Sequence, residues 1–299
     1  MVVTQCIVCD RSGPFPKVWG PIVRCRHCGL AFQDPQPSDA ELARSYYHDS
    51  EFSRLLLGPL RQFTVQRARE KLELLRSSGA LRPGARLLDV GSSSGAWLEL
   101  AQAEGMEATG VELGGTTAEH ARARGLDVRT GTLTDCFPDG SPERFDVITF
   151  WDVLEHVRDP RVELRAAARL LAPSGTVAAS FPNIAGWYPR ATYRLLAKPF
   201  GVWEYPELPV HLYDFAPETA GRLLERSGFT VTALHTTAVP FSFYRTTSLS
   251  RDALGRGPRA LMLRAAFEAL RLVVYPAARA FDRQNALFVT ASLQRTPTA

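Results

Sequence analysis

The stretch that decides the fold is Arg86-Leu87-Leu88-Asp89-Val90-Gly91-Ser92-Ser93-Ser94-Gly95. An apolar strand pattern leads into a turn of small residues, and the amphipathic segment 95–104 that follows predicts a helix. Gly91 and Gly95 let the backbone approach a ligand where this helix begins. Glu112 ends the next predicted strand, where an α/β fold places a carboxylate that accepts hydrogen bonds from ribose hydroxyls.

The glycine spacing separates two kinds of nucleotide ligand. Dinucleotide sites use G-x-G-x-x-G, whereas this turn has G-x-x-x-G with Asp89 two residues before Gly91. A carboxylate there would repel a pyrophosphate and attract the cationic amino-acid end of S-adenosylmethionine. The alternative is an ordinary glycine-rich turn between a strand and a helix, but the combination of Asp89, Gly91, Gly95 and Glu112 favours cofactor binding.

Strand and helix patterns alternate over the rest of the chain. Strands are predicted at 85–90, 108–112, 126–130, 145–151, 175–181, 229–236 and 286–294, and helices at 95–104, 116–124, 160–171 and 216–227. This alternation predicts an α/β fold with a doubly wound, Rossmann-like sheet of seven strands. We expect three parts: a zinc ribbon at 1–34, a helical linker or lid at 35–79, and a cofactor-binding domain at 80–299 with insertions at 182–215 and 250–283.

Four of the five cysteines form two Cys-x-x-Cys pairs in the first 28 residues, at Cys6, Cys9, Cys25 and Cys28. This spacing is typical of a zinc ribbon, in which four thiolates surround one tetrahedral Zn²⁺. Because no ligand is missing, the site is expected to be structural rather than catalytic. Two disulfides in a secreted domain are the alternative, which the absence of a secretory signal at the N-terminus disfavours.

Composition and charge exclude several classes of protein. The chain has 299 residues, 45% of them hydrophobic, and a net charge of +4, which is small for a nucleic-acid-binding protein. Residues 250–299 carry eight arginines against three carboxylates, a net charge of +5, which leaves −1 for the other residues. The uncharged stretch 170–189 is interrupted by proline and glycine, so no transmembrane segment is predicted and a cytoplasmic protein is expected.

Several motifs, taken in order, resemble class I S-adenosylmethionine-dependent methyltransferases. LLDVGSSSG (87–95) and GVELGG (110–115) resemble the first two motifs of that family. FDVITFWDVLEHVRDP (145–160) is similar to the segment around the fourth strand in the branch that includes ubiquinone-biosynthesis methyltransferases, and LAPSGTVAASFPN (171–183) to the fifth strand. The cysteine segment, with Tyr46-Tyr47 after it, resembles bacterial methyltransferases that carry an N-terminal zinc ribbon and are often linked to sugar, polysaccharide or antibiotic biosynthesis.

The resemblance implies a set of cofactor contacts. They are Asp89, Gly91, Ser92, Ser93, Gly95, Glu112, Leu113, Thr132, Leu133, Trp151 and Asp152. Two positions depart from the family pattern. Ser93 stands where the first motif usually has a glycine, and the third strand ends without the common aspartate at the adenine amine, a contact that Asp135 or backbone groups would then make.

Methyl transfer requires alignment of the two reactants, exclusion of water and, for an oxygen or nitrogen nucleophile, a base. His156 and His211 are the candidate bases. Asp152, Glu155 and His156 also match an acid-x-x-Glu-His cluster that binds a divalent metal in some quinone O-methyltransferases; the alternative is that Glu155-His156 caps the next helix. His211 stands in the insertion at 182–215, whose many aromatic residues would line a substrate pocket or pack the insertion onto the sheet.

These features lead to one expected function and two alternatives. The expected function is methyl transfer to a small-molecule acceptor, in natural-product, sugar or polysaccharide biosynthesis. A ribosomal RNA methyltransferase with a zinc module is one alternative, although Phe181-Pro182-Asn183 differs from the N-P-P-aromatic turn that grips a base amine. A non-catalytic scaffold is the other.

The helical stretch at 250–283, whose apolar residues are expected on or near one face, would pack on the sheet, form a homodimer or rest on an anionic membrane.

Overall fold

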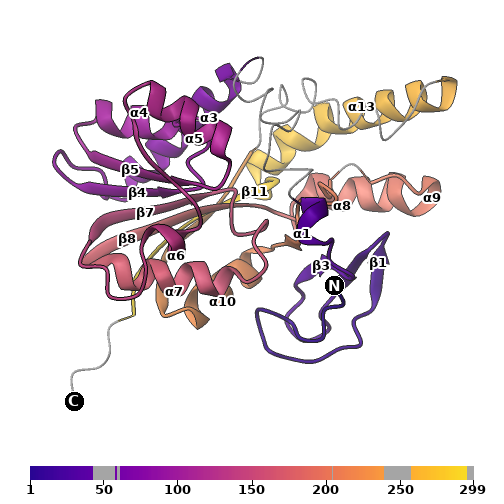
Figure 1. The fold of residues 1–299 in the computed structure, drawn as a ribbon. Helices are drawn as coiled ribbons and strands as arrows, with labels where there is room; N and C mark the ends of the chain where they lie inside the picture. The colour runs from indigo at the N-terminus through magenta and orange to yellow at the C-terminus, as the bar shows by residue number, and fades with distance from the viewer. Residues whose placement is uncertain (43–57, 59–60, 204, 239–256, 295–299) are drawn as a thin grey trace.

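The computed structural model describes residues 1–42, 58, 61–203, 205–238 and 257–294. Its centre is a seven-stranded sheet in the order β10-β11-β8-β7-β4-β5-β6 (Figure 1). The strands are β4 (Arg86–Val90), β5 (Glu107–Glu112), β6 (Asp127–Thr130), β7 (Phe145–Trp151), β8 (Leu171–Pro182), β10 (Phe229–Thr237) and β11 (Ala286–Leu293). All seven strands expected from the sequence are present, and the predicted α/β fold is confirmed.

The order of the strands fixes where a ligand can bind. β4 pairs in parallel with both β5 and β7, and the chain runs outward from β4 through β5 to β6 before it returns to β7. The strand order therefore reverses between β4 and β7, where open α/β sheets form a crevice beyond the carboxyl ends of their strands. β11 runs antiparallel between β8 and β10 and completes the sheet.

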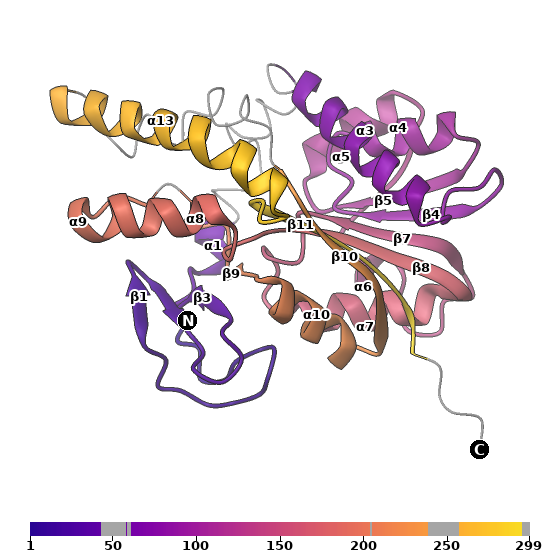
Figure 2. The same cartoon turned by 180° about the vertical axis from the view of Figure 1, so that it is seen from behind.

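Helices cover both faces of the sheet (Figures 1 and 2). One face carries α3 (Arg61–Ser77), α4 (Ala96–Ala103) and α5 (Gly115–Ala123), and the other carries α6 (Leu133–Cys136), α7 (Pro160–Leu170) and α10 (Pro217–Arg226). Adjacent strand residues point to opposite faces. Leu87 accordingly packs in the core that contains Trp97, and Leu88 in the core that contains Leu164. The mostly apolar sequences of β4 and β7 reflect burial on both sides.

The cysteine-containing segment is joined to the large domain by a small second sheet. Strands β1 (Lys17–Trp19), β2 (Ile22–Arg24) and β3 (Ala31–Gln33) form an antiparallel sheet, and β3 also pairs with β9 (Tyr213–Asp214) from the insertion at 182–215. Asp10 accepts hydrogen bonds from Arg161 of α7, at 2.8 Å, and from Arg226 of α10. A short helix, α1 (Asp39–Leu42), follows. Much of the expected linker or lid at 35–79, including Tyr46 and Tyr47, lies outside the described residues.

The two insertions form helices that lie against each other beyond the edge of the sheet (Figures 1 and 2). The first contains α8 (Trp187–Thr192), the π-helical turn η2 (Tyr193–Ala197) and α9 (Lys198–Phe200); the second contains α13 (Pro258–Ala280). Leu263 and Phe267 of α13 are buried with Leu196 of η2, so the inner side of α13 packs on the other insertion rather than on the sheet. The expectation of one apolar face was wrong, because Leu261 and Val273 point outward into solvent.

Candidate active site

A cavity of about 340 Å³ opens at the carboxyl ends of the parallel strands, beside the β4–β7 reversal. Most of the cofactor residues expected from the sequence line it: Asp89, Gly91, Ser92, Ser93, Glu112, Leu113, Thr132, Leu133, Trp151 and Asp152. His156 and His211 line the same cavity. Gly95 does not. The structure therefore brings ten of the eleven expected cofactor residues and both expected bases into one space.

The two glycines of the first motif serve different purposes. Gly91 has a φ of 76°, and a Cβ there would lie 2.5 Å from Val153 Cγ2 at the cavity wall. Gly95 has a φ of 81° and begins α4, where a Cβ would lie 2.2 Å from Leu126 Cδ1. Gly95 thus allows α4 to pack closely against its neighbours. Between them, Ser93 adopts a φ of 49°, the left-handed conformation that glycine would enter more easily, so the serine keeps the turn's shape.

Asp89 is 2% exposed and lies at the floor of the cavity. Thr149 Oγ1 donates a 2.6 Å hydrogen bond to its carboxyl group. Burial raises the pKa of Asp89 to about 7, against the hydrogen bond from Thr149 and the positive charge of Lys71, which both lower it. A cation placed here would be attracted to the carboxylate and would favour its ionised form.

Glu112, the last residue of the neighbouring strand β5, fixes the conformation of the first-motif turn. Its two carboxylate oxygens accept hydrogen bonds from the N–H of Ser93 and the N–H of Gly114, both at 2.7 Å. Burial raises the pKa of Glu112, and these two N–H donors oppose that rise. Each carboxylate oxygen retains a second lone pair, so Glu112 can still accept hydrogen bonds from ligand hydroxyls.

The far end of the cavity carries apolar and backbone groups. Thr132 begins α6, and its N–H and hydroxyl both donate to Asp135 at 2.9 and 2.6 Å. Those bonds lower the pKa of Asp135. The Asp135 carboxylate is thus used as a helix cap, and Asp135 does not line the cavity; the suggestion that it reaches an adenine is wrong. Leu113 and Leu133 line the cavity with apolar side chains.

Sequence reasoning missed the contribution of α3. Lys71 lies over the Trp151 ring, 5.1 Å from its centroid, and its Nζ donates to Asp152 at 3.1 Å. Ser180 Oγ donates to the same carboxylate at 2.8 Å. Burial opposes ionisation of Asp152, but the charges of Lys71 and Arg67 and these hydrogen bonds prevail and hold its pKa well below the usual range. Arg67 and Lys71 stand four residues apart on one helix face, which is the only signal the sequence gives.

Two histidines that line the cavity are in contact with each other. The rings of His156 and His211 are 4.7 Å apart between centroids, and His156 Nδ1 lies 2.9 Å from the carbonyl of Val210. That carbonyl can only accept, so Nδ1 carries the proton. Burial lowers the pKa of His156 to about 3 and of His211 to about 4, so both rings are neutral at pH 7. Among the described residues, His211 Nδ1 is buried without a hydrogen-bond partner.

Glu155 completes this cluster. Its carboxylate is buried with no hydrogen-bond partner in the described part of the chain, and burial raises its pKa well above the usual range. Ligand atoms of Glu155, His156 and His211 lie within 4.8 Å of one another, close enough to share a metal ion. The expected cluster with Asp152 is not formed, because Asp152 pairs with Lys71. The capping alternative is wrong too, because Asp159 caps α7.

The strand β3 positions the segment that carries His211. Gln33 Nε2 donates to the carbonyls of Pro209 and His211, at 2.9 and 2.6 Å, although about 180 residues separate them in the sequence. The half-buried Glu207 lines the cavity and lies 3.5 Å from His211 Nε2. Sequence reasoning missed Gln33 and Glu207. Tyr205 of the same insertion lines the cavity, whereas Trp203 packs on Trp19 of β1, so the aromatic residues serve both suggested purposes.

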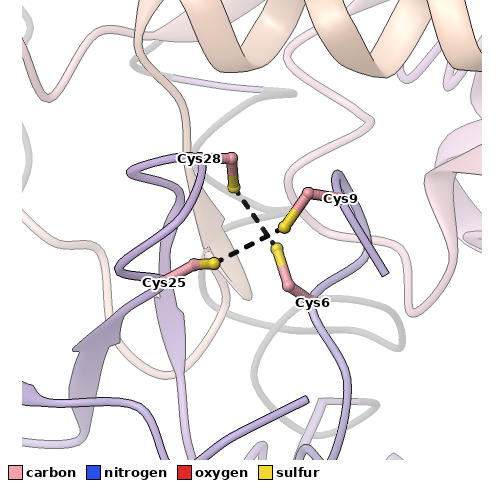
Figure 3. Close-up of side chains that lie close together, drawn as sticks. All are labelled: Cys6, Cys9, Cys25 and Cys28. Carbon is pink, nitrogen blue, oxygen red and sulfur yellow. Dashed lines mark hydrogen bonds between the residues drawn. The ribbon is translucent and has the colours of Figure 1, made fainter. Parts of the chain in front are cut away.

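The four N-terminal cysteines point toward a common centre (Figure 3). Cys6 Sγ lies 3.5 Å from Cys28 Sγ, and Cys9 Sγ lies 3.6 Å from Cys25 Sγ. These separations are too long for disulfides. They are near the edge of about 3.8 Å expected for a tetrahedron with Zn–S bonds of about 2.3 Å. All four thiol sulfurs lie within 4.8 Å of one another, so the arrangement fits a single tetrahedral ion.

The sheet order and the cavity at its reversal define a Rossmann-like fold of the S-adenosylmethionine-dependent methyltransferase class. A family model described as "Methyltransferase domain" matches residues 62–234. The chain belongs to this methyltransferase family. Among the described residues, no helix is both long enough and apolar enough to cross a bilayer.

Similar proteins agree with this family. The ubiquinone biosynthesis O-methyltransferase of Methylococcus capsulatus is 37% identical over 99 residues, which cover 31% of this chain and 42% of that protein. Its counterpart in Vibrio cholerae is 32% identical over 124 residues, 40% of this chain and 49% of that protein. The chain therefore matches less than half the length of these curated relatives.

Solved structures resemble the fold. Magnesium protoporphyrin IX methyltransferase from Synechocystis PCC 6803, crystallised with bound SAH, has a TM-score of 0.55 and 14% identity, covering 86% of this chain and 100% of that one. A SAM-dependent methyltransferase from Thermotoga maritima has a TM-score of 0.51 and 18% identity, covering 81% and 98% of the two chains. At these identities the likeness concerns the fold alone.

Proposed function

We propose that the protein transfers a methyl group from S-adenosylmethionine to a hydroxyl oxygen of a small-molecule acceptor. The observation that carries the proposal is that one cavity combines the residues suited to the cofactor with two neutral, buried histidines. The names of the relatives in ubiquinone biosynthesis support an oxygen nucleophile. Phenolic, natural-product and sugar hydroxyls are acceptors of this chemical class.

The residues of the cavity fit the cofactor at three points. The Asp89 carboxyl would pair with the ammonium group, and Glu112 would accept hydrogen bonds from ribose hydroxyls with the lone pairs left after its bonds to Ser93 and Gly114. Leu113 and Leu133 would enclose the adenine ring. When bound, S-adenosylmethionine supplies a methyl group already activated by the sulfonium charge.

The chain's own contribution to the reaction is orientation, exclusion of water and acceptance of a proton. Burial keeps His211 neutral at pH 7, and its Nδ1, which lacks a partner in the described part of the chain, can accept the acceptor's hydroxyl proton. His156 packs against the His211 ring and is itself fixed by the Val210 carbonyl. We therefore assign His211 as the base and His156 as its positioning neighbour.

A divalent cation bound by Glu155, His156 and His211 would also promote loss of the acceptor's hydroxyl proton. The buried Glu155 carboxylate without a partner among the described residues fits a metal ligand, and the two imidazoles supply nitrogen donors. Bound there, a divalent ion would lower the pKa of an acceptor hydroxyl and orient it. Metal analysis and activity after chelation distinguish this role from that of a simple base.

We propose a structural Zn²⁺ at Cys6, Cys9, Cys25 and Cys28.

The experiment is a methyl-transfer assay with radiolabelled S-adenosylmethionine and a panel of catechols, phenols and sugar nucleotides, with ribosomal RNA as the competing substrate class. We expect a small hydroxylated acceptor to be labelled, and His211→Ala to slow labelling by about 10²–10⁴-fold while cofactor affinity stays unchanged. Labelling of RNA alone would favour the ribosomal alternative. Cofactor binding with no transfer to any acceptor would favour the scaffold.

A further inference from the structure

The outer side of α13 is an apolar surface without cover among the described residues. Leu261, Leu272 and Val273 are 69%, 69% and 71% exposed, and Met262 is 55% exposed. The other exposed positions from Leu261 to Ala280 are small or apolar except for one arginine: Ala265, Ala269, Pro276, Arg279 and Ala280. We call this strip of α13, from Leu261 to Ala280, the outer strip.

The inner side of the same helix is apolar as well. Leu263 and Phe267 are 3% and 2% exposed and pack with Leu196 of the neighbouring insertion. An ordinary surface helix carries polar residues on the side opposite its core contacts, whereas a helix that is apolar on both sides is normally covered on both. The outer strip therefore has the composition of a contact surface.

The charges around the outer strip select the kind of partner. The helices of the two insertions, at 187–200 and 258–280, carry seven arginine and lysine residues against the single carboxylate of Glu268, a net charge of +6. The whole chain carries +4, so everything outside these helices has a net charge of −2. The positive charge is thus concentrated on the protruding pair of helices.

The helix that packs on the inner side of α13 is basic as well. Arg190 of α8, Arg194 of η2 and Lys198 of α9 are exposed, and Leu195 and Phe200 are 56% and 43% exposed. The pair of helices lies beyond the edge of the sheet (Figures 1 and 2).

We propose that the paired insertions dock peripherally on an anionic lipid bilayer. Apolar side chains such as Leu272 and Val273 would enter the boundary between headgroups and acyl chains, while the flanking basic residues would meet anionic headgroups. A second copy of the chain would instead bring two clusters of positive charge together, which disfavours a dimer through this surface.

The experiment is co-sedimentation of the full chain with phosphatidylcholine vesicles and with vesicles that contain phosphatidylglycerol. We expect binding to the anionic vesicles, weakened by high salt. Leu272→Asp combined with Val273→Asp should abolish binding. Arg279→Glu, which changes the exposed basic residue of the outer strip, should weaken it by at least about fivefold.

Matched controls stand on α7 and α10, which cover one face of the sheet away from α13 (Figures 1 and 2). Val162→Asp on α7 and Arg222→Glu on α10 change an exposed apolar and an exposed basic residue there, and both should leave vesicle binding intact. Thermal unfolding and cofactor affinity verify that each variant is folded. Failure of the native chain to bind anionic vesicles overturns the proposal, as does equal loss in the controls. A dimer that Leu272→Asp disrupts, without vesicle binding, would assign the outer strip to self-association.

Discussion

Asp89 should make cofactor binding depend on pH in a way that one substitution removes. Its carboxyl has a pKa of about 7 in the free protein because it is buried, and the cationic cofactor binds the ionised form. At pH 6 about one carboxyl in eleven is ionised, and at pH 8 about ten in eleven. The dissociation constant for S-adenosylmethionine should therefore be about tenfold larger at pH 6 than at pH 8.

The sign follows from the raised pKa. Below pH 7 the free protein holds a proton that binding must release, so affinity rises with pH; about 0.9 proton should be released at pH 6. Calorimetry in buffers of different ionisation enthalpy measures that number. Lys71 and Glu112 are the charged groups that act on Asp89, and the two histidines stay neutral over this range.

Two variants test the assignment. Asp89→Asn should bind more weakly and with no change between pH 6 and pH 8. Glu207→Gln is the control, because burial also raises the pKa of Glu207 to about 7 and this residue lines the same cavity. The control should keep the tenfold pH effect. A flat pH profile in the native protein, or a pH effect that survives in Asp89→Asn, would refute the reasoning.

Three further perturbations test other parts of the structure. Cys25→Ser should reduce zinc, measured by elemental analysis, from about one ion per chain to nearly none; zinc-free native protein would contradict the site. Gln33→Ala removes one buried and one partly buried hydrogen bond and should destabilise the fold by about 2–3 kcal/mol in denaturant unfolding. It should slow methyl transfer while cofactor affinity stays constant; equal losses of transfer rate and of cofactor affinity would contradict a positioning role. Gly95→Ala should cost about 2–4 kcal/mol of stability because of its φ and the contact with Leu126, whereas Gly115→Ala, which meets nothing within 4 Å, should be nearly neutral.

The sequence was informative where function depends on local pattern. The first-motif turn, Glu112 and the two cysteine pairs each lie within a short segment, and the order of strands and helices follows from apolar periodicity. Asp89 and Glu112 could therefore be placed in one cavity before the structure was known, since strand ends of a parallel sheet meet at one edge.

Residues that depend on packing between distant segments could not be predicted. Gln33 contacts Pro209 and His211 through a strand pairing that no local signal marks. Lys71 enters the cavity because α3 packs beside α4, and its pairing with Asp152 leaves His211 as the third member of the Glu155 cluster. The sequence predicted a single apolar face for α13, whereas the structure has two, because periodicity alone does not show which side of a helix meets a neighbour.

The measurement that tests the central claim most directly is calorimetric titration of the native chain with S-adenosylmethionine, repeated with two variants of β5. We predict one cofactor per chain and a loss of about 1–3 kcal/mol in Glu112→Ala, which removes a charged hydrogen-bond acceptor. Glu107→Ala, an exposed carboxylate at the other end of the same strand, should bind like the native protein. Absence of binding to the native chain, or unchanged affinity in Glu112→Ala, would contradict the account.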